Sequence, residues 1–278
     1  MNEDESLRAR LWPTVLLRVI RWLPLATALC VLVCALLAPS VAVAQEPFSI
    51  QALPATVEEL RKQFPAEQIG VLEKLNRRDA ERLVRTDPPV PGLVVPAMWD
   101  FGDHAYSPFP LEWTAITTHP KYLVVHQPIQ AFAAYEFGKL VRWGPVSSGR
   151  KETPTPAGAF NLTWRSRKRT STDNDAWILE WYFNFINSRG ISFHQFDLPG
   201  YAASHACVRL LERDAQWIYG WGDQWKLSAD TRAVDVPGTP VLIIGAFGHG
   251  DPPPWVSLPS LWKPIELPVA APHPPPGG

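Results

Sequence analysis

The sequence predicts a mainly β protein whose larger part carries one bracing helix and whose smaller, N-terminal part is mostly helical. Three observations lead to this fold class. Runs rich in β-branched and aromatic residues recur between 122 and 244, and glycine or proline bounds them. Apolar residues at helical spacing precede these runs, between 56 and 84. One more helical pattern, at 211–222, lies between two of the runs.

The composition bounds the possible functions. The chain has 278 residues, of which 46% are hydrophobic, and its net charge is −1. This length allows one full-sized domain and a smaller one. The balanced charge gives no reason to expect a nucleic-acid partner. The basic run at 164–169 is therefore expected to be a solvated loop, or else a site that attracts carboxylates. No cofactor motif is found, and no cofactor is expected.

Residues 1–44 predict a secretory signal peptide. Several arginines precede an apolar run from 23 to 44, and this run ends in Ala-Val-Ala before Gln45. We therefore expect an exported protein. A retained anchor is the alternative, because about 20 apolar residues can span a bilayer. Contact with a membrane is expected only through this segment if it stays uncleaved.

Residues 45–97 predict a small, mostly helical subdomain. Thr56-Val57-Glu58-Glu59 has the form of a capping box, 66–76 has helical spacing, and Asp79 is placed to cap a short helix at 80–84. The stretch 72–96 resembles a degenerate LysM peptidoglycan-binding module. The other interpretation is a plain helical unit that packs on the following domain. Residues 98–120 are rich in proline and aromatics and are expected to form a linker.

Strand signals dominate from 121 to 247. They predict a strand at 122–126, a hairpin that turns at Gly138, and a distal strand at 240–244. The aromatic run at 176–183 is expected to pack in the core. The helix at 211–222 carries acidic residues near its positive N-terminal end and is expected to brace the strand before it. Residues 248–278 predict a proline-rich tail, extended or disordered.

The thiol of Cys207 is the first candidate for chemistry. Cys30 and Cys34 fall in the predicted signal peptide, so the exported chain keeps Cys207 alone. A single exported cysteine cannot form an internal disulfide, and it is either an inert, buried hydrophobe or a reactive thiol. His194 and His205 lie near it in the chain, and imidazole is the usual base that activates a thiol. We therefore interpret 191–210 as an active site.

The spacing of these residues predicts how they meet. If 204–210 is extended, His205 and Cys207 share one face of the strand, and their neighbours share the other. His194 then returns beside them on a neighbouring strand, because Pro199-Gly200 is a turn signal.

At these residues the chain resembles the L,D-transpeptidase catalytic (YkuD-type) domain, whose signature is an upstream His followed by Ser-His-Gly-Cys, a hydrophobic residue and often Arg. The chain reads SHACVR from Ser204 to Arg209, after His194. A second stretch, TPTPAGAF at 153–160, resembles the Thr-Pro, Gly and aromatic that the family carries after an opening hairpin. The resemblance covers about 121–247.

Two features depart from the family pattern. Ala206 stands where the family usually has Gly, which matters if the backbone there needs a positive φ. The spacing from His194 to Cys207 is also a few residues shorter than in many members, which bears on substrate preference more than on chemistry.

The resemblance implies a role for each residue of the motif. Cys207 is expected to be the nucleophile and His194 the base, with a backbone carbonyl orienting its ring and His205 in a secondary role. Arg209 either binds a substrate carboxylate or forms a structural ion pair. Backbone N–H groups of Cys207 and Ala206 are expected to meet the oxyanion. The expected substrate contacts are Ser204, Ala206, Gly200 and Arg209.

The implied fold is a YkuD-like β-sandwich, and the implied activity is acyl transfer on peptidoglycan in the periplasm or cell envelope of a bacterium. The thiolate would attack the carbonyl before the terminal D-alanine of a tetrapeptide stem, and an amine would resolve the thioester to form a cross-link. Water as acceptor would give a murein carboxypeptidase or endopeptidase instead. An inactive cell-wall binding module is the second alternative. A zinc site of His194, His205 and Cys207 is the third, although no fourth ligand or paired-cysteine spacing supports a metal.

Overall fold

The strands between 122 and 244 assemble into one large sheet, and the fold is mainly β as predicted. The computed structural model describes residues 47–87, 89–172, 174–250, 252–257 and 264–272. In this part of the chain the sheet has nine strands in the order β6-β13-β3-β4-β5-β10-β9-β8-β7. Their bounds are β3 (Tyr122–His126), β4 (Ala131–Glu136), β5 (Lys139–Ser147), β6 (Gly158–Asn161), β7 (Arg165–Thr170), β8 (Ile178–Ile186), β9 (Ile191–Gln195), β10 (Val208–Leu210) and β13 (Pro240–Ile244).

Some predictions fall on residues outside the described ones. The predicted signal peptide, with Cys30 and Cys34, is among them, and so is part of the proline-rich tail. Within the described ranges, no helix is both long enough and apolar enough to cross a membrane.

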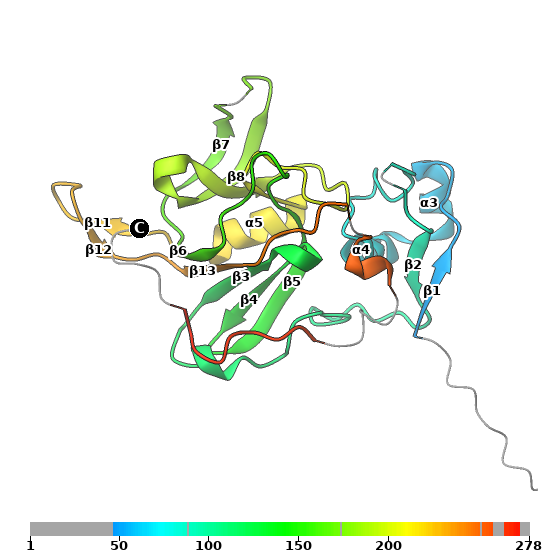
Figure 1. Ribbon diagram of the computed structural model, residues 1–278, viewed down its shortest axis with the longest axis horizontal. Coiled ribbons are helices and arrows are strands. Elements are labelled where there is room, and N and C mark those ends of the chain that lie inside the picture. The colour runs from blue at the N-terminus through cyan, green and yellow to red at the C-terminus, as the bar shows by residue number, and fades with distance from the viewer. Residues whose placement is uncertain (1–46, 88, 173, 251, 258–263, 273–278) are drawn as a thin grey trace, which may run out of the picture. The chain divides into compact units, whose positions relative to one another are not determined.

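The sheet curls around an apolar core, and α5 (Glu212–Trp221) lies between its two halves (Figure 1). Leu123 of β3 and Phe193 of β9 belong to the same buried cluster, although their strands are well separated in the sheet order. Ala215 and Ile218 of α5 join this cluster, to which Val208 of β10 also belongs. The predicted helix is confirmed, but it packs mainly against β8 and β9 rather than against the strand before it.

A second apolar cluster covers the opposite face of β3, β4 and β5. Phe109, Trp113 and Ile116 are buried in it, so the segment predicted as a linker packs against the sheet. The last described stretch of the tail, 264–272, has no helix or strand and lies over the same cluster. It is fastened there by Trp113, whose Nε1–H donates to the Pro268 carbonyl over 2.7 Å.

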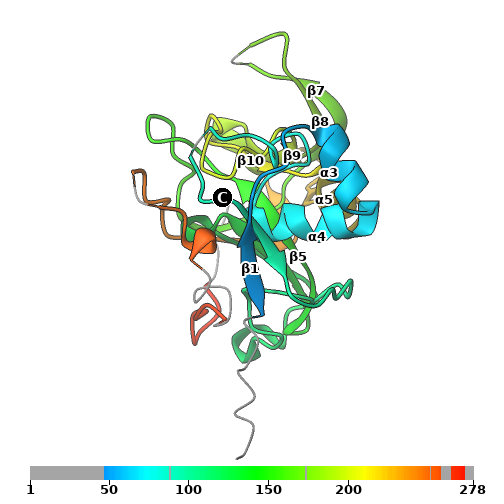
Figure 2. The same ribbon diagram turned by 90° about the vertical axis from the view of Figure 1, so that its right-hand side faces the viewer.

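The N-terminal part has the order β1 (Phe48–Gln51), α3 (Val57–Gln63), α4 (Ala66–Asn76) and β2 (Leu93–Pro96), and its two strands pair antiparallel (Figure 2). The capping box is confirmed, because Thr56 Oγ1 accepts from the Glu59 N–H over 3.1 Å. The helix predicted at 80–84 is wrong: these residues form turns. Asp79 does cap this turn, because its Oδ1 accepts from the Arg82 N–H, but the carbonyls of Arg82 and Arg85 accept from the Arg78 side chain instead of continuing a helix.

The basic run predicted as a solvated loop is instead β7, an edge strand of the sheet. Positive charge on an edge discourages pairing with other chains. Arg167 and Lys168 each form an ion pair with Glu180 of β8, at 3.0 and 3.1 Å. On the same neighbouring strand Tyr182 and Phe183 are buried, so the predicted packing of aromatic residues is confirmed there.

Smaller elements complete the fold. A two-stranded hairpin projects from the sheet (Figure 1), and four short 3-10 turns lie in the loops. They are β11 (Lys226–Leu227) and β12 (Val234–Val236) in the hairpin, and η1 (Thr114–Ile116), η2 (Gln127–Ile129), η3 (Asn187–Arg189) and η4 (Pro254–Val256).

Candidate active site

Two parallel strands, β9 and β10, hold the candidate catalytic residues side by side (Figure 2). In their register Phe193 pairs with Val208, and both side chains lie in the core. His194 pairs with Arg209, so alternation directs these two side chains to the opposite face. The return of His194 on a neighbouring strand therefore agrees with the sequence prediction.

A small cavity of about 30 Å³ brings together most of the predicted site residues. Cys207, His194, His205, Arg209 and Ser204 all line it. This volume is enough for a water molecule but far too small for a peptide. The structure thus brings together on one surface five residues that lie between positions 194 and 209 of the sequence.

His194 is buried, and its ring is oriented by the backbone. Its Nδ1 lies 2.9 Å from the carbonyl oxygen of Gln195. A carbonyl only accepts hydrogen bonds, so Nδ1 carries the proton and Nε2 keeps a free lone pair. Burial lowers the pKa of His194 to about 4, and the positive charge of Arg209 adds to this effect. The imidazole is therefore neutral near pH 7 and can accept a proton at Nε2.

Cys207 is half-buried and lies beside Ser192. Their Sγ and Oγ atoms are 3.5 Å apart, and the Gly190 carbonyl oxygen lies 3.9 Å from the sulfur. Sequence reasoning missed Ser192. The signal was present, because Ser192 stands two positions before His194 on the same strand and alternation gives both the same face.

Ala206 adopts a left-handed backbone conformation, with φ of 76°. The strand is therefore limited to Val208–Leu210, shorter than the extended stretch that the sequence predicts. The predicted division between the faces still holds, since Ala206 lies in the core while Cys207 lines the cavity. Thr155 fixes this conformation: its Oγ1 donates to the Ala206 carbonyl over 2.8 Å and accepts from the Gly149 N–H over 2.8 Å. Thr155 belongs to the TPTPAGAF stretch, so this second motif supports the first.

Ser204 holds the loop before Cys207 in place through backbone hydrogen bonds. Its N–H donates to the Ser148 carbonyl over 2.9 Å, and its own carbonyl accepts from the Arg150 N–H over 2.8 Å. Gln130 holds Ser148 in turn, because Gln130 Oε1 accepts from the Ser148 N–H over 2.8 Å. The side chain of Ser204 is only 3% exposed. The loop before Cys207 is thus fastened on both sides.

Arg209 supports the loop that follows β9. Its guanidinium lies over the ring of Phe196, 4.6 Å from the centroid, and its Nη1–H faces the Asp197 carbonyl at 3.5 Å. Burial lowers the pKa of Arg209 from its ordinary value. Because it also lines the cavity, the guanidinium remains placed to meet a substrate carboxylate.

His205 and Gly200 occupy different surroundings. The ring of His205 packs against Trp177, with centroids 5.1 Å apart, and its Nδ1 is buried without a hydrogen-bond partner among the described residues.

Gly200, with φ of 93°, lies against Arg78 of the N-terminal part. A Cβ at this position would stand 2.8 Å from Arg78 Nε, so glycine is needed there for space as well as for the turn.

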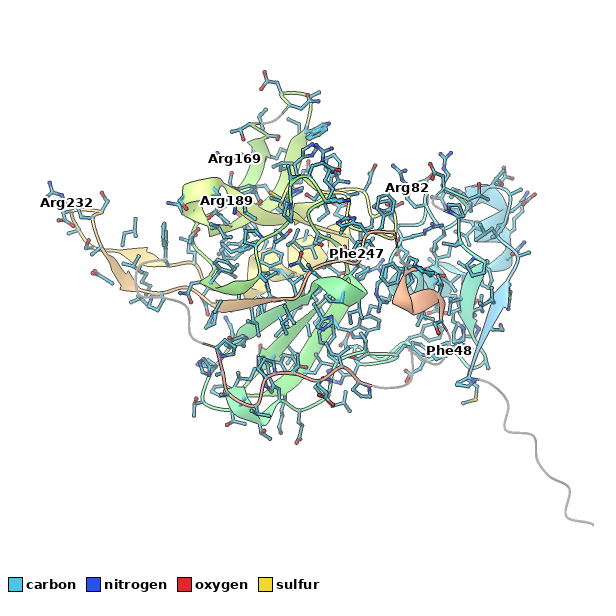
Figure 3. All side chains as sticks on the ribbon, viewed as in Figure 1. Phe48, Arg82, Arg169, Arg189, Arg232 and Phe247 are labelled. Atoms are coloured by element: carbon cyan, nitrogen blue, oxygen red, sulfur yellow. The ribbon has the colours of Figure 1, made fainter. Side chains whose placement is uncertain are left out.

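Cys207 also opens onto a larger cleft of about 580 Å³ on the side of η3. Arg169, Arg189 and Glu152 lie in its wall together with Gly190. Arg169 is held by its neighbours, since its guanidinium lies 4.9 Å from the ring of Trp164. Arg169 and Arg189 lie in the same region of the molecule, well separated from Arg82 (Figure 3). We call this region the η3 cleft.

The metal alternative has no geometric support. Across the described ranges, no three His, Cys, Asp or Glu side chains come close enough together to hold a metal ion. His194, His205 and Cys207 share a cavity without forming such a cluster.

Comparison with solved structures finds L,D-transpeptidases at low identity. The enzyme from Stackebrandtia nassauensis is 23% identical over 46% of this chain and 57% of its own, with a TM-score of 0.38. One from Mycobacterium tuberculosis H37Rv is 24% identical over 45% of this chain and 58% of its own, with a TM-score of 0.36. This chain therefore spans less than two thirds of the length of these proteins. Comparison with curated proteins found no match.

A family model gives the stronger result. The model of the L,D-transpeptidase catalytic domain (YkuD) matches residues 120–243. The match contains both sequence motifs, the whole of β9 and β10, and every residue that lines the small cavity. Residues 120–243 of this chain thus match the L,D-transpeptidase catalytic domain (YkuD) family.

Proposed function

We propose that the protein is a cysteine-dependent L,D-transpeptidase that acts on the tetrapeptide stems of peptidoglycan. The observation that carries this proposal is the tautomer of His194. The Gln195 carbonyl holds its Nδ1 proton, which leaves Nε2 as a base in the cavity that Cys207 lines. A neutral imidazole beside a thiol is the arrangement that nucleophilic catalysis by cysteine requires.

The reaction begins with transfer of the Cys207 proton to His194 Nε2. The sulfur attacks the carbonyl carbon before the terminal D-alanine, and an S–C bond forms as the oxyanion develops. Backbone N–H groups of Cys207 and Ala206 are the proposed donors to this oxyanion. The C–N bond to D-alanine then breaks, and His194 returns its proton to the leaving amine. The product is a thioester on Cys207, and free D-alanine departs.

An amine resolves the thioester. Its nitrogen attacks the thioester carbon, a C–N bond forms, and the C–S bond breaks to release the thiolate. His194 takes the proton that the amine loses and returns it to the sulfur. The donor in the family is commonly a diamino acid of a neighbouring stem, so the product would be a cross-link between two stems. No cofactor is required, because the D-alanyl bond supplies the acyl group.

Hydrolysis is the second candidate, and the size of the cavity favours it. A space of about 30 Å³ beside His194 can admit water to the thioester. The protein would then shorten or cleave stems as a carboxypeptidase or endopeptidase. Both reactions share the first half and differ only in the acceptor.

Location and partners follow from this activity. We place the protein outside the cytoplasm, in the bacterial envelope, where its substrate lies, and this agrees with the predicted signal peptide. The glycan strand that carries the stems is a proposed ligand of the N-terminal part, as its resemblance to LysM modules suggested.

The test uses the exported chain and a disaccharide tetrapeptide. Intact-protein mass should reveal an adduct of the stem minus D-alanine on the wild type, and muropeptide analysis should reveal cross-linked dimers. Cys207→Ala should give neither product, and His194→Gln should slow adduct formation by at least about 100-fold. Shortened monomers without dimers would assign the hydrolase. An unmodified wild type that still binds the sugar would assign the binding module.

A further inference from the structure

A large cleft lies beside the candidate active site and has one wall outside the family match. Its volume is about 1030 Å³. One wall is the turn segment 79–87, which follows α4. The opposite wall comes from the end of β9 and the first turns of α5. Because the family match begins at 120, the segment 79–87 is a contribution of this chain's own N-terminal part.

Phe196 connects this cleft to the chemistry. It lines both the large cleft and the small cavity that holds Cys207 and His194. The centroid of the Phe196 ring lies 6.0 Å from the ring centroid of His194 and also 6.0 Å from that of Trp177. A ligand in the large cleft can therefore contact the side chain that packs beside the base.

The cleft carries charges of both signs, and acidic residues outnumber arginines in its lining: Glu73, Asp79, Glu81, Asp87, Asp197 and Glu212 against Arg82, Arg85 and Arg213. Arg82 and Arg85 come from the turn segment, and Glu212 lies opposite at the start of α5. Arg82 is partly engaged with Asp197, at 2.8 Å, but both side chains are largely exposed and such a pair is weak. Arg85 is exposed, while its carbonyl oxygen accepts from Arg78 over 2.8 Å and fixes its backbone. Such a surface suits a ligand that itself carries both ammonium and carboxylate groups.

The two clefts differ in what they reach. Cys207 lines the η3 cleft directly, so a scissile carbonyl bound there meets the sulfur. The large cleft reaches the cavity through Phe196, next to His194, which is the group that must deprotonate an incoming amine. The peptide that is attacked and the peptide that attacks thus have separate approaches to one site.

We propose that the large cleft binds the acceptor of the transfer, a peptide strand with a free amine and free carboxylates, and that Arg82 and Arg85 bind its carboxylates. We call it the acceptor cleft. The inference rests on the proposed function, because it assigns a place to that reaction's second substrate. The amine of the bound strand passes Phe196, loses its proton to His194 Nε2 and forms the new C–N bond, while the C–S bond breaks and the thiolate takes up the proton.

The experiment separates acylation from transfer in the exported chain. Intact mass gives the rate of acyl-enzyme formation from a disaccharide tetrapeptide. A tripeptide stem with a diamino acid is then added at increasing concentration, and the ratio of cross-linked dimer to hydrolysed product is measured. Arg82→Ala with Arg85→Ala should leave the acylation rate unchanged and lower this ratio about fivefold below saturation. More acceptor should restore the ratio, and Arg85→Lys alone should retain most of it.

Two control variants each remove one arginine elsewhere in the molecule. Arg189→Ala in the η3 cleft should slow acylation and leave the product ratio unchanged. Arg232→Ala, on the hairpin at the far end of the molecule from Arg82 (Figure 3), should change neither. An unchanged ratio in the Arg82 and Arg85 variant, with normal acylation, overturns the acceptor cleft alone. Acylation followed only by hydrolysis in the wild type also overturns it and leaves the nucleophile in place. Failure of the wild type to acylate overturns the proposed function itself.

Discussion

Asp79 and Leu198 exchange two hydrogen bonds across 119 positions of the chain. The Asp79 N–H donates to the Leu198 carbonyl over 3.1 Å, and the Leu198 N–H donates to Asp79 Oδ2 over 2.7 Å. Leu198 lies in the loop that joins His194 to Cys207. The N-terminal part therefore fixes the backbone between the proposed base and the proposed nucleophile.

Asp79→Ala should slow acyl-enzyme formation by about 10-fold or more, because a small displacement of reacting groups is costly to the rate. Asp79→Asn should recover part of this rate, since its amide oxygen can still accept from the Leu198 N–H. The measurement is single-turnover acylation by intact mass, with stability followed by urea unfolding. Asp100→Ala is the matched control: Asp100 Oδ1 also accepts a backbone N–H, from Gly102, at an exposed site. Equal losses of rate in both alanine variants would contradict a positioning role for Asp79.

The contact between Asp79 and Leu198 also marks the limit of prediction from the sequence. Local signals were sufficient for α4, α5, β3 and β13, because helical spacing and β-branched runs depend on near neighbours. The grouping of Cys207 and His194 followed from alternation and a turn signal. The helix predicted at 80–84 stops after one capped turn, because the Arg78 side chain takes two carbonyls there. The burial of Trp113 was missed because the sheet that covers it is formed later in the chain.

Ser192→Ala should lower the reactivity of Cys207. The Ser192 hydroxyl lies 3.5 Å from the sulfur and is placed to donate a hydrogen bond to a thiolate there. Loss of one such hydrogen bond, about 1 kcal/mol, corresponds to roughly a fivefold slower reaction. The checks are the rate of acylation and the rate of alkylation by iodoacetamide at neutral pH. Ser49→Ala on β1 makes the same change far from the thiol, and the two variants should differ in both rates. Identical alkylation rates would exclude a role for Ser192.

Burial of His194 predicts that stability falls in mild acid. The folded pKa is about 4, whereas the unfolded chain has an ordinary value near 6.5. Below pH 6.5 the His194 ring is therefore protonated in the unfolded state but stays neutral in the folded state. Stability is complete above pH 6.5 and declines as the pH falls toward 4, by roughly 3 kcal/mol for this group. His126, whose pKa burial also lowers to about 4, adds to the same trend.

Urea unfolding at pH 7, 6 and 5 measures this effect. His194→Gln should show a flatter dependence of the free energy of unfolding on pH than the wild type, because it removes one proton-binding group of the unfolded state. His104→Gln replaces an exposed histidine and is the matched control. Parallel slopes for all three proteins would mean that the His194 ring is accessible to protons in the folded state.

Variants of Ala206 measure whether a residue other than glycine at this positive φ lowers stability or slows acylation. Its φ of 76° strains an alanine by about 1 kcal/mol. Ala206→Gly relieves this strain, but it removes a buried methyl worth about 0.8 kcal/mol and adds freedom to the unfolded chain worth about 0.4–1 kcal/mol. The opposing effects nearly cancel. Ala206→Gly should therefore change the free energy of unfolding by less than about 1 kcal/mol and leave acylation intact.

The control is Ala202→Gly, because Ala202 is 2% exposed and is not among the described residues of positive φ. It loses a buried methyl without any relief of strain, so it should be destabilised by about 1 kcal/mol more than Ala206→Gly. Ala206→Val should cost at least about 2 kcal/mol and slow acylation, since a β-branched residue at this φ disturbs the carbonyl that Thr155 holds. If both glycine variants lose equal stability, Ala206 is unstrained, and its departure from the family pattern has no energetic consequence for the loop before Cys207.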